Sequence, residues 1–263
     1  MSASLYLQLF LEPVIRSKTY RSRFGVGSKE EGVSRDEFLS LYGADPFYAW
    51  IGLNSDLMYA AHRAAGGMTS LYRQIGIGCE MLFRQIICDQ TEYSDPTFAS
   101  WSYTTTASTS KPKTLQLDAR LEIDQINNAP VANNVQQWIN KVCHLLDANT
   151  PTNGAVFEVR QGYKSKDSKR QNADIDNTAV AWSKGYLPIF AIFSAQIDTD
   201  IVLRYRNNRS GILIGYMADD PTISLYAFMK DVLGYDLAAF FMRNSPTIRS
   251  QVQDVVQTLL SVS

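Results

Sequence analysis

Apolar residues recur at three- and four-residue spacing in the first third of the chain, a pattern typical of amphipathic helices. The pattern runs through segments 5–14, 45–65 and 69–89. Gly66 and Gly67 lie between the second and third of these segments and are expected to separate them. The chain up to residue 92 is therefore predicted to be mostly helical.

From residue 97 the period changes to two, as expected for strands. Segments 98–108 and 114–124 are rich in β-branched and aromatic residues, and the turn-like sequence SKPK lies between them. This pattern predicts an antiparallel hairpin. In the second strand, Leu117 and Leu121 are expected to face the core, while Asp118 lies on the polar face.

Helices and strands alternate in the rest of the chain. We predict an amphipathic helix at about 135–147, a strand at 154–160, a helix at 168–184 that ends at Gly185, and a buried strand at 186–193. The near-continuous apolar character of the last strand favours a central, parallel position. The fold class is therefore α/β, a mixed central sheet flanked by helices, with a helical N-terminal region and a helical C-terminus.

With 263 residues, 45% of them hydrophobic, the chain can bury a full core. We expect a single domain over 1–263, with a mostly helical part at 1–92 and an α/β core at 93–263. No segment approaches the ~20 apolar residues that span a bilayer, and no signal sequence is recognisable, so we expect a cytoplasmic protein that does not enter membranes. The three cysteines lack metal-site spacing and are expected to be buried thiols.

Positive charge is concentrated in one short segment, although the net charge of the chain is only -1. Five cations fall within eleven residues: Arg160, Lys164, Lys166, Lys169 and Arg170. Such local charge indicates a site for a polyanion. A solvated strand edge followed by a lysine-rich helix start is the alternative interpretation.

The strand that leads into this basic segment carries a carboxylate. Alternation places Glu158 and Arg160 on one face of the strand, and Phe157 and Val159 on the other. A carboxylate and a cation are thereby held side by side at the end of a buried element. Metal-assisted phosphodiester chemistry requires such a pair.

In the order of its elements, the chain resembles the PD-(D/E)xK nuclease superfamily, and more specifically the type II restriction endonucleases. The resemblance covers roughly 69–193: a long helix, antiparallel strands, a strand with Glu158-Val159-Arg160, a helix and a buried strand. It implies a restriction-endonuclease-like core in which an Asp of the second strand and the (D/E)xK motif of the third bind Mg²⁺. It also implies a homodimer that cleaves double-stranded DNA at specific sequences and restricts foreign DNA.

The resemblance assigns roles to individual residues. Glu158 takes the place of the metal-binding acid, and Arg160 stands where the family has Lys. Because Arg stays protonated, its role there is electrostatic, and Lys164 is the alternative source of an amine. The second metal ligand is Asp118 by topology or Asp147 by its short spacing from the motif; Asp118 is favoured.

Two further acidic residues are considered on the same grounds. Glu80 lies on the long helix, where some family members carry a carboxylate that completes the metal site, and pairing with Arg84 is its alternative role. Asp174 follows the basic segment and, with Gln171, stands where many family members place a polar residue that faces the site; an ordinary exposed helix turn is the alternative, and it is favoured for Asp174.

DNA contacts are expected from two segments. Lys166, Lys169 and Arg170, at the start of a helix, are expected to bind phosphates. Segments 201–205 and 211–216 predict a second hairpin, and its polar loop offers candidate readers of base edges: Arg204, Arg206, Asn207, Asn208 and Arg209. The alternative functions are a non-catalytic nucleic-acid-binding module, and a structural protein that dimerises through its aromatic C-terminal helices.

Overall fold

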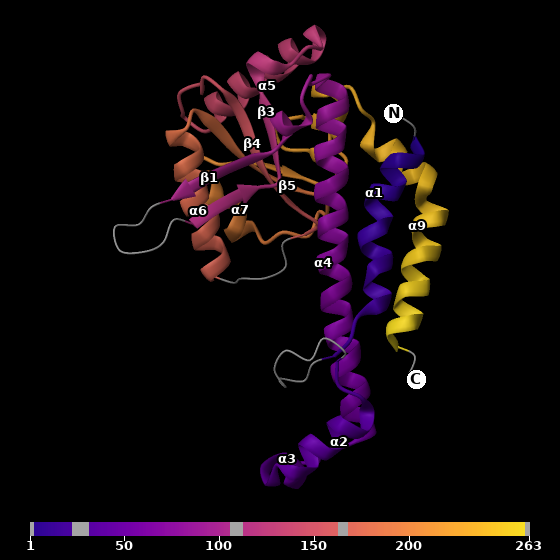
Figure 1. Cartoon of the computed structure of the whole chain (residues 1–263). Helices are drawn as coiled ribbons and strands as arrows, with labels where there is room; N and C mark the ends of the chain where they lie inside the picture. Colours follow the sequence, from indigo (N-terminus) through magenta and orange to yellow (C-terminus); the bar gives the residue numbers. More distant parts are fainter. Residues whose placement is uncertain (1–2, 23–31, 106–112, 163–167, 261–263) are drawn as a thin grey trace. The chain divides into compact units, whose positions relative to one another are not determined.

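A computed structural model describes residues 3–22, 32–105, 113–162 and 168–260 (Figure 1). The chain divides into two compact units, each treated separately below. The sheet unit comprises residues 1–6 and 79–243, and the helical unit comprises residues 7–78 and 244–263. The division thus lies at residue 78 rather than at residue 92, because the last turns of the long helix pack with the sheet.

A four-stranded mixed sheet forms the centre of the sheet unit. Its strands, in spatial order, are β3 (Ala119–Glu122), β4 (Gly154–Arg160), β5 (Tyr186–Ile192) and β6 (Gly211–Ile214). β3 runs antiparallel to β4, while β4, β5 and β6 are parallel to one another. The predicted strand at 154–160 and the central parallel strand that follows it are both confirmed.

The predicted hairpin is present as a two-stranded antiparallel ladder of β1 (Trp101–Thr105) and β2 (Lys113–Leu117). Trp101 and Tyr103 pack in a buried cluster with Val156 of β4. A bend at Asp118 then separates β2 from β3. The predicted second strand is therefore divided at Asp118, and only its second half joins the main sheet.

Helices flank the sheet, as the sequence predicts (Figure 1). They are α5 (Ala129–Leu145), α6 (Ser168–Ser183), α7 (Thr199–Asn207), α8 (Leu225–Ala227) and the π-helical turn Phe228–Val232, with short 3-10 turns at Pro96–Ala99 and Ile123–Gln125. Gly185 follows α6 with a φ of 78°, which is the left-handed conformation expected of a C-cap glycine. The helix predicted at 168–184 is thus confirmed.

The two faces of β4 differ in character. Phe157 points to an apolar face, where its ring centroid lies 5.2 Å from that of Phe83, 6.3 Å from that of Trp138 and 5.8 Å from that of Phe228. All four aromatic side chains are buried. The opposite face carries Glu158, so the alternation predicted for this strand is confirmed.

The predicted hairpin at 201–216 is wrong. Residues 199–207 form α7, and β6 pairs with β5 in a parallel ladder instead of with a neighbouring hairpin strand. The reason is that Ile201 and Tyr205, four residues apart, are both buried against Phe190 and its neighbours in the sheet. The Asp198 side chain accepts a hydrogen bond from the Asp200 N–H and caps the helix.

The helix predicted at 135–147 begins earlier, at Ala129. Asn128 is its N-cap, and the side-chain oxygen of Asn128 accepts a hydrogen bond from the Val131 N–H. Pro130 is compatible with the first turn because a missing N–H is no loss there. An Asn- and Pro-containing segment that resembles a loop is therefore the start of the helix.

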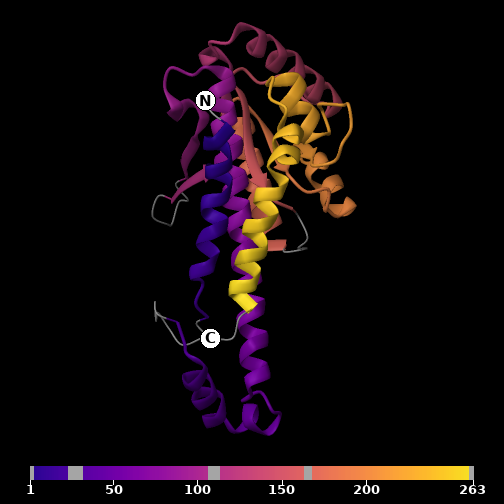
Figure 2. The same ribbon diagram turned by 90° about the vertical axis from the view of Figure 1, so that its right-hand side faces the viewer.

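The helical unit is built mainly from long helices that continue into the sheet unit. Its elements are α1 (Ala3–Arg16), the 3-10 turn Ser17–Thr19, α2 (Arg35–Ala44), α3 (Pro46–Trp50), α4 (Asp56–Thr91) and α9 (Leu237–Leu260). Figures 1 and 2 both show α1, α4 and α9 side by side, and Val14, Leu71, Val255 and Leu259 form their buried contact.

α4 is continuous through Gly66 and Gly67, so the predicted break between two helices is wrong. A Cβ atom at Gly66 would lie 2.0 Å from the Tyr20 hydroxyl oxygen, and one at Gly67 would lie 3.1 Å from a Leu259 methyl carbon. The two glycines thus let Tyr20 and Leu259 pack closely against α4, and they do not end the helix.

The three cysteines are free thiols; Cys79 and Cys143 are buried and Cys88 is half-buried. Across the described segments, every helix is too short or too polar to cross a bilayer.

Candidate acidic site beside strand β4

Asp118, at the bend before β3, and Glu158 of β4 are neighbours. The antiparallel register pairs Ala119 with Phe157, which places the preceding Asp118 opposite Glu158. The Asp118 N–H donates to the Phe157 carbonyl oxygen at 2.9 Å, and the Val159 N–H donates to Asp118 Oδ2 at 2.7 Å. These two backbone contacts hold the Asp118 carboxylate against β4.

Arg160 links β4 to helix α6. Its Nη2 lies 2.8 Å from Glu158 Oε1 and 2.9 Å from Asp174 Oδ1. The side chains of Glu158 and Arg160 are only 16% and 13% exposed, so this ion pair is largely shielded from water. The guanidinium therefore joins a candidate metal ligand to a carboxylate of the following helix.

Asp174 is buried, with 4% exposure, so its prediction as an exposed helix residue is wrong. Besides Arg160, it binds the Tyr205 hydroxyl, which donates to Asp174 Oδ2 at 2.6 Å. Gln171, Asp174 and Thr178 form the buried polar face of α6, with the three- and four-residue spacing of one helix side. That spacing and the family resemblance are the sequence signals for Asp174, whereas Tyr205 carries none.

Glu80 of α4 belongs to the same group of charges. Burial and, less strongly, the negative charge of Asp118 together raise the pKa of Glu80 to about 7, against the opposing effect of Arg84 and Arg160. Arg84 donates from Nε to the Asp118 carbonyl oxygen at 2.6 Å. Arg84 thus acts on both Glu80 and Asp118, which extends the simple helix pair expected from the sequence.

Negative charge dominates this group. Burial raises the pKa of Glu158 to about 8; Arg160 opposes the shift, and the carboxylates of Asp118, Asp174 and Glu80 add to it. Burial also raises the pKa of Asp118, against the hydrogen bond from the Val159 N–H. A cation that approached these carboxylates would be attracted, because it would relieve their mutual repulsion.

The raised pKa of Glu158 makes stability depend on pH. Its pKa is about 8 in the folded protein and 4.5 in an ordinary environment, so the folded state holds the proton more tightly. Without divalent cations, the free energy of unfolding should therefore fall between pH 4.5 and pH 8, by on the order of 5 kcal/mol from this group. Urea unfolding across this range should show a shallower fall for Glu158→Gln; equal slopes would contradict the assignment.

The chemistry of the donors suits Mg²⁺, which prefers carboxylate oxygens. In the described part of the chain, however, no three His, Cys, Asp or Glu side chains are already arranged as a set of metal ligands. Glu158 Oε1 is engaged by Arg160, and Asp118 Oδ2 is engaged by the Val159 N–H. Cation binding through Glu158 Oε1 would therefore require the Glu158 side chain to turn from Arg160.

The other predicted catalytic residues lie elsewhere or outside the described residues. Asp147 is exposed in the turn after α5, with a φ of 49°, whereas Asp118 lies opposite Glu158. Lys164 and Lys166 lie outside the described residues. Lys169 and Arg170 belong to the first turn of α6, and the positions of their side chains are likewise outside the description.

The predicted base-reading loop is in fact the C-terminal part of α7. Arg204 donates from Nη1 to Gln171 Oε1 and from Nη2 to Asn172 Oδ1, both at 2.6 Å, so it links α7 to α6. Arg206, Asn208 and Arg209 are exposed at the helix end. Positive side chains are favourable there because the helix dipole places negative charge at its C-terminus.

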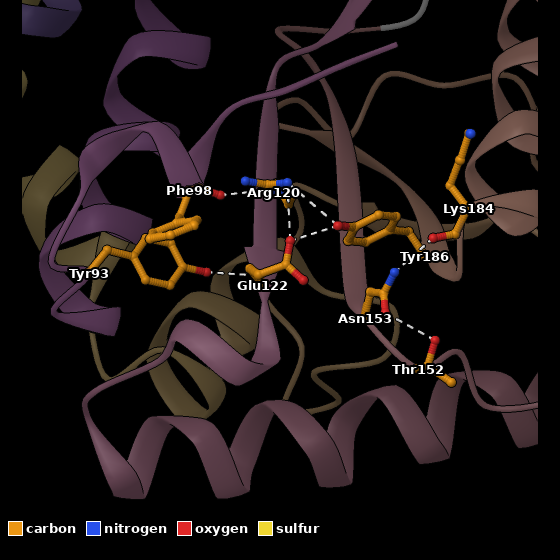
Figure 3. A network of polar contacts seen from close by, with 8 residues as sticks. All are labelled: Tyr93, Phe98, Arg120, Glu122, Thr152, Asn153, Lys184 and Tyr186. Carbon is orange, nitrogen blue, oxygen red and sulfur yellow. Dashed lines mark hydrogen bonds and ion pairs between the residues drawn. The ribbon is translucent and has the colours of Figure 1, made fainter.

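A second polar cluster lies on β3 and β5. Arg120 pairs with Glu122 at 3.1 Å, and the Tyr186 hydroxyl donates to Glu122 Oε2 at 2.6 Å (Figure 3). Arg120 also donates to the Phe98 carbonyl oxygen, and the Glu122 N–H donates to the Tyr93 hydroxyl (Figure 3). The charges of Arg120 and Glu122 are thus paired with each other, and Glu122 lies opposite Gly154, away from Glu158.

A small, partly open pocket adjoins the acidic group. Glu158, Asp174, Asn177 and Thr178 form its polar lining, and apolar residues of β2, β4 and β5 complete it. Two carboxylates of the candidate site, those of Glu158 and Asp174, thus line this pocket.

Comparison of the chain with protein-family models, curated proteins and solved structures finds no match. Function is therefore inferred from the residues of the site and their geometry.

Proposed function

We propose that this protein is a Mg²⁺-dependent, site-specific endonuclease that hydrolyses phosphodiester bonds of double-stranded DNA, as type II restriction enzymes do. The observation that carries the proposal is the placement of Asp118 directly opposite Glu158, with Arg160 on the same face of β4. An acid at the start of β3 and an ExR motif on β4, followed by a helix and a parallel strand, support the resemblance to the core of the PD-(D/E)xK superfamily.

Each charged residue has a distinct role in this proposal. Asp118 and Glu158 supply carboxylate oxygens for Mg²⁺, and Glu80 lies close enough to add to their charge. When bound, Mg²⁺ would neutralise charge on the scissile phosphate and favour attack by water. Arg160 stays protonated, so it stabilises negative charge on the phosphate and does not accept a proton.

DNA binding is assigned to the basic segment between β4 and α6. Lys166, Lys169 and Arg170 follow Arg160 closely in sequence, so phosphates bound by them would lie near the acidic site, and Lys164 is kept as the alternative source of an amine. A homodimer is the expected assembly, because two-fold symmetry suits a palindromic target.

One observation favours the alternative of a nucleic-acid-binding protein without catalysis. Arg160 is already paired with both Glu158 and Asp174, which is what a purely structural ion pair would look like. In that case the basic segment binds phosphates and Glu158 only orients Arg160.

Incubation with a long, unmethylated viral DNA separates the two functions. A nuclease should produce discrete fragments with Mg²⁺ and none with EDTA, because the site requires a divalent cation. A gel-shift measurement in EDTA reports binding alone. Binding without cleavage in Mg²⁺ or Mn²⁺ would support the non-catalytic alternative, and the absence of both would contradict both.

A further inference from the structure

Arg160 forms ion pairs with two carboxylates, one of which is the proposed metal ligand Glu158. Its Nη2 contacts both Glu158 Oε1, at 2.8 Å, and Asp174 Oδ1, at 2.9 Å. A guanidinium that pairs with a metal ligand competes with the cation for the same carboxylate, and it also repels the cation. A nuclease with Arg in this position therefore needs a second anion that retains the guanidinium.

Asp174 has the properties of that second anion. It lies on α6, outside the Asp118–Glu158 pair, and it is 4% exposed. The Tyr205 hydroxyl fixes its other oxygen, Oδ2, at 2.6 Å. Tyr205 is itself rigid, since it is fully buried and stacks on Phe190 with ring centroids 4.1 Å apart.

We propose that Asp174, held by Tyr205, is a positioning residue that keeps Arg160 in place when Glu158 turns to bind a divalent cation. The inference rests on the proposed function, because it assigns Glu158 as a metal ligand. When Glu158 turns away from Arg160, the guanidinium keeps its ion pair with Asp174, so no unpaired charge is left in a site shielded from water.

The loss of Asp174 should weaken cation binding. Arg160 contacts the carboxylates of Glu158 and Asp174, and in Asp174→Asn only that of Glu158 is still charged. The divalent cation must then compete with Arg160 for Glu158. We expect about a tenfold loss of cation affinity, the effect typical of residues that orient metal ligands. Arg160→Gln should do the opposite and tighten cation binding, because it removes the competitor.

The test uses Mn²⁺, which takes the same oxygen ligands as Mg²⁺ and whose free form is counted by electron paramagnetic resonance. Mn²⁺ affinity is measured for the wild type, Asp174→Asn, Arg160→Gln and the double variant. If Asp174 acts through Arg160, Asp174→Asn should have almost no effect in the Arg160→Gln background. An equal tenfold loss in both backgrounds would overturn the inference, because Asp174 would then act on the cation directly.

Two further variants control for charge and folding. Asp176→Asn removes an equal charge from an exposed position of the same helix and should leave Mn²⁺ affinity unchanged. Tyr205→Phe removes one hydrogen bond from Asp174 and should weaken Mn²⁺ binding by up to about fivefold, even if Asp174→Asn fails to fold. Unchanged affinity in Tyr205→Phe would count against the inference. A wild type that neither binds Mn²⁺ nor cleaves DNA would instead reject the proposed function, and the inference with it.

Discussion

Glu158→Gln is expected to reduce Mg²⁺-dependent DNA cleavage by roughly 10³-fold or more, because it removes the charge of the proposed metal ligand while keeping the shape of the side chain. Affinity for duplex DNA should change by less than about threefold, since phosphate contacts with the basic segment provide most of it. Single-turnover cleavage and a filter-binding titration measure the two quantities separately.

The same experiment tests the choice of second ligand. Asp118→Asn should be as inactive as Glu158→Gln, whereas Asp147→Asn, at an exposed turn, should cleave like the wild type. An inactive Asp147 variant beside an active Asp118 variant would show that the second ligand is assigned wrongly.

A stability measurement shows whether Glu158→Gln is inactive because it unfolds or because it has lost the chemistry. Burial makes ionisation of Glu158 unfavourable, so the variant should be at least as stable as the wild type at pH 8 without divalent cations. A lower melting temperature at this pH would point to lost folding instead of lost chemistry.

Elements with strong local signals were predictable from the sequence. β4 and β5 are short apolar runs bounded by turn residues, and Gly185 marks the end of α6. In these segments the local pattern and the tertiary environment agree. The mixed sheet flanked by helices followed from the order of such elements.

The predicted hairpin at 201–216 and the predicted helix break at Gly66 and Gly67 were wrong because tertiary packing, and not the local sequence pattern, determines the structure there. The segment around Ile201 and Tyr205 carries apolar residues that suit a strand or one face of a helix, and burial against β5 and β6 favours the helix. Gly66 and Gly67 weaken a helix locally, but close contact with Tyr20 and Leu259 compensates.

Only the part of the candidate site formed by Asp118, Glu158 and Arg160 could be predicted from the sequence. Side-chain alternation placed Asp118 and Glu158 on polar faces, and the order of the strands brought them together. Asp174 and Tyr205 are 31 residues apart in the sequence, and their contact depends on how α6 and α7 pack on the sheet. Their link to Arg160 is a tertiary feature that no local pattern contains.

Arg160→Ala is expected to destabilise the protein by about 3–5 kcal/mol near pH 8, the usual effect of removing one partner of a buried ion pair. The reason is that Asp174, at 4% exposure, and the shielded Glu158 would both lose the contact with the Arg160 guanidinium. At pH 5 the loss should be smaller, because Glu158 is protonated well below its pKa of about 8. Urea unfolding at both pH values measures the difference.

Arg160→Lys is the matched variant that separates charge from geometry. Lys keeps the positive charge but lacks the planar fork of Arg, so it should recover part of the stability that Arg160→Ala loses. It should also cleave DNA faster than Arg160→Ala, because a cation remains near the phosphate, where the family has Lys. Equal cleavage by the wild type, Arg160→Lys and Arg160→Ala would limit Arg160 to the ion pair with Asp174 and remove it from the chemistry.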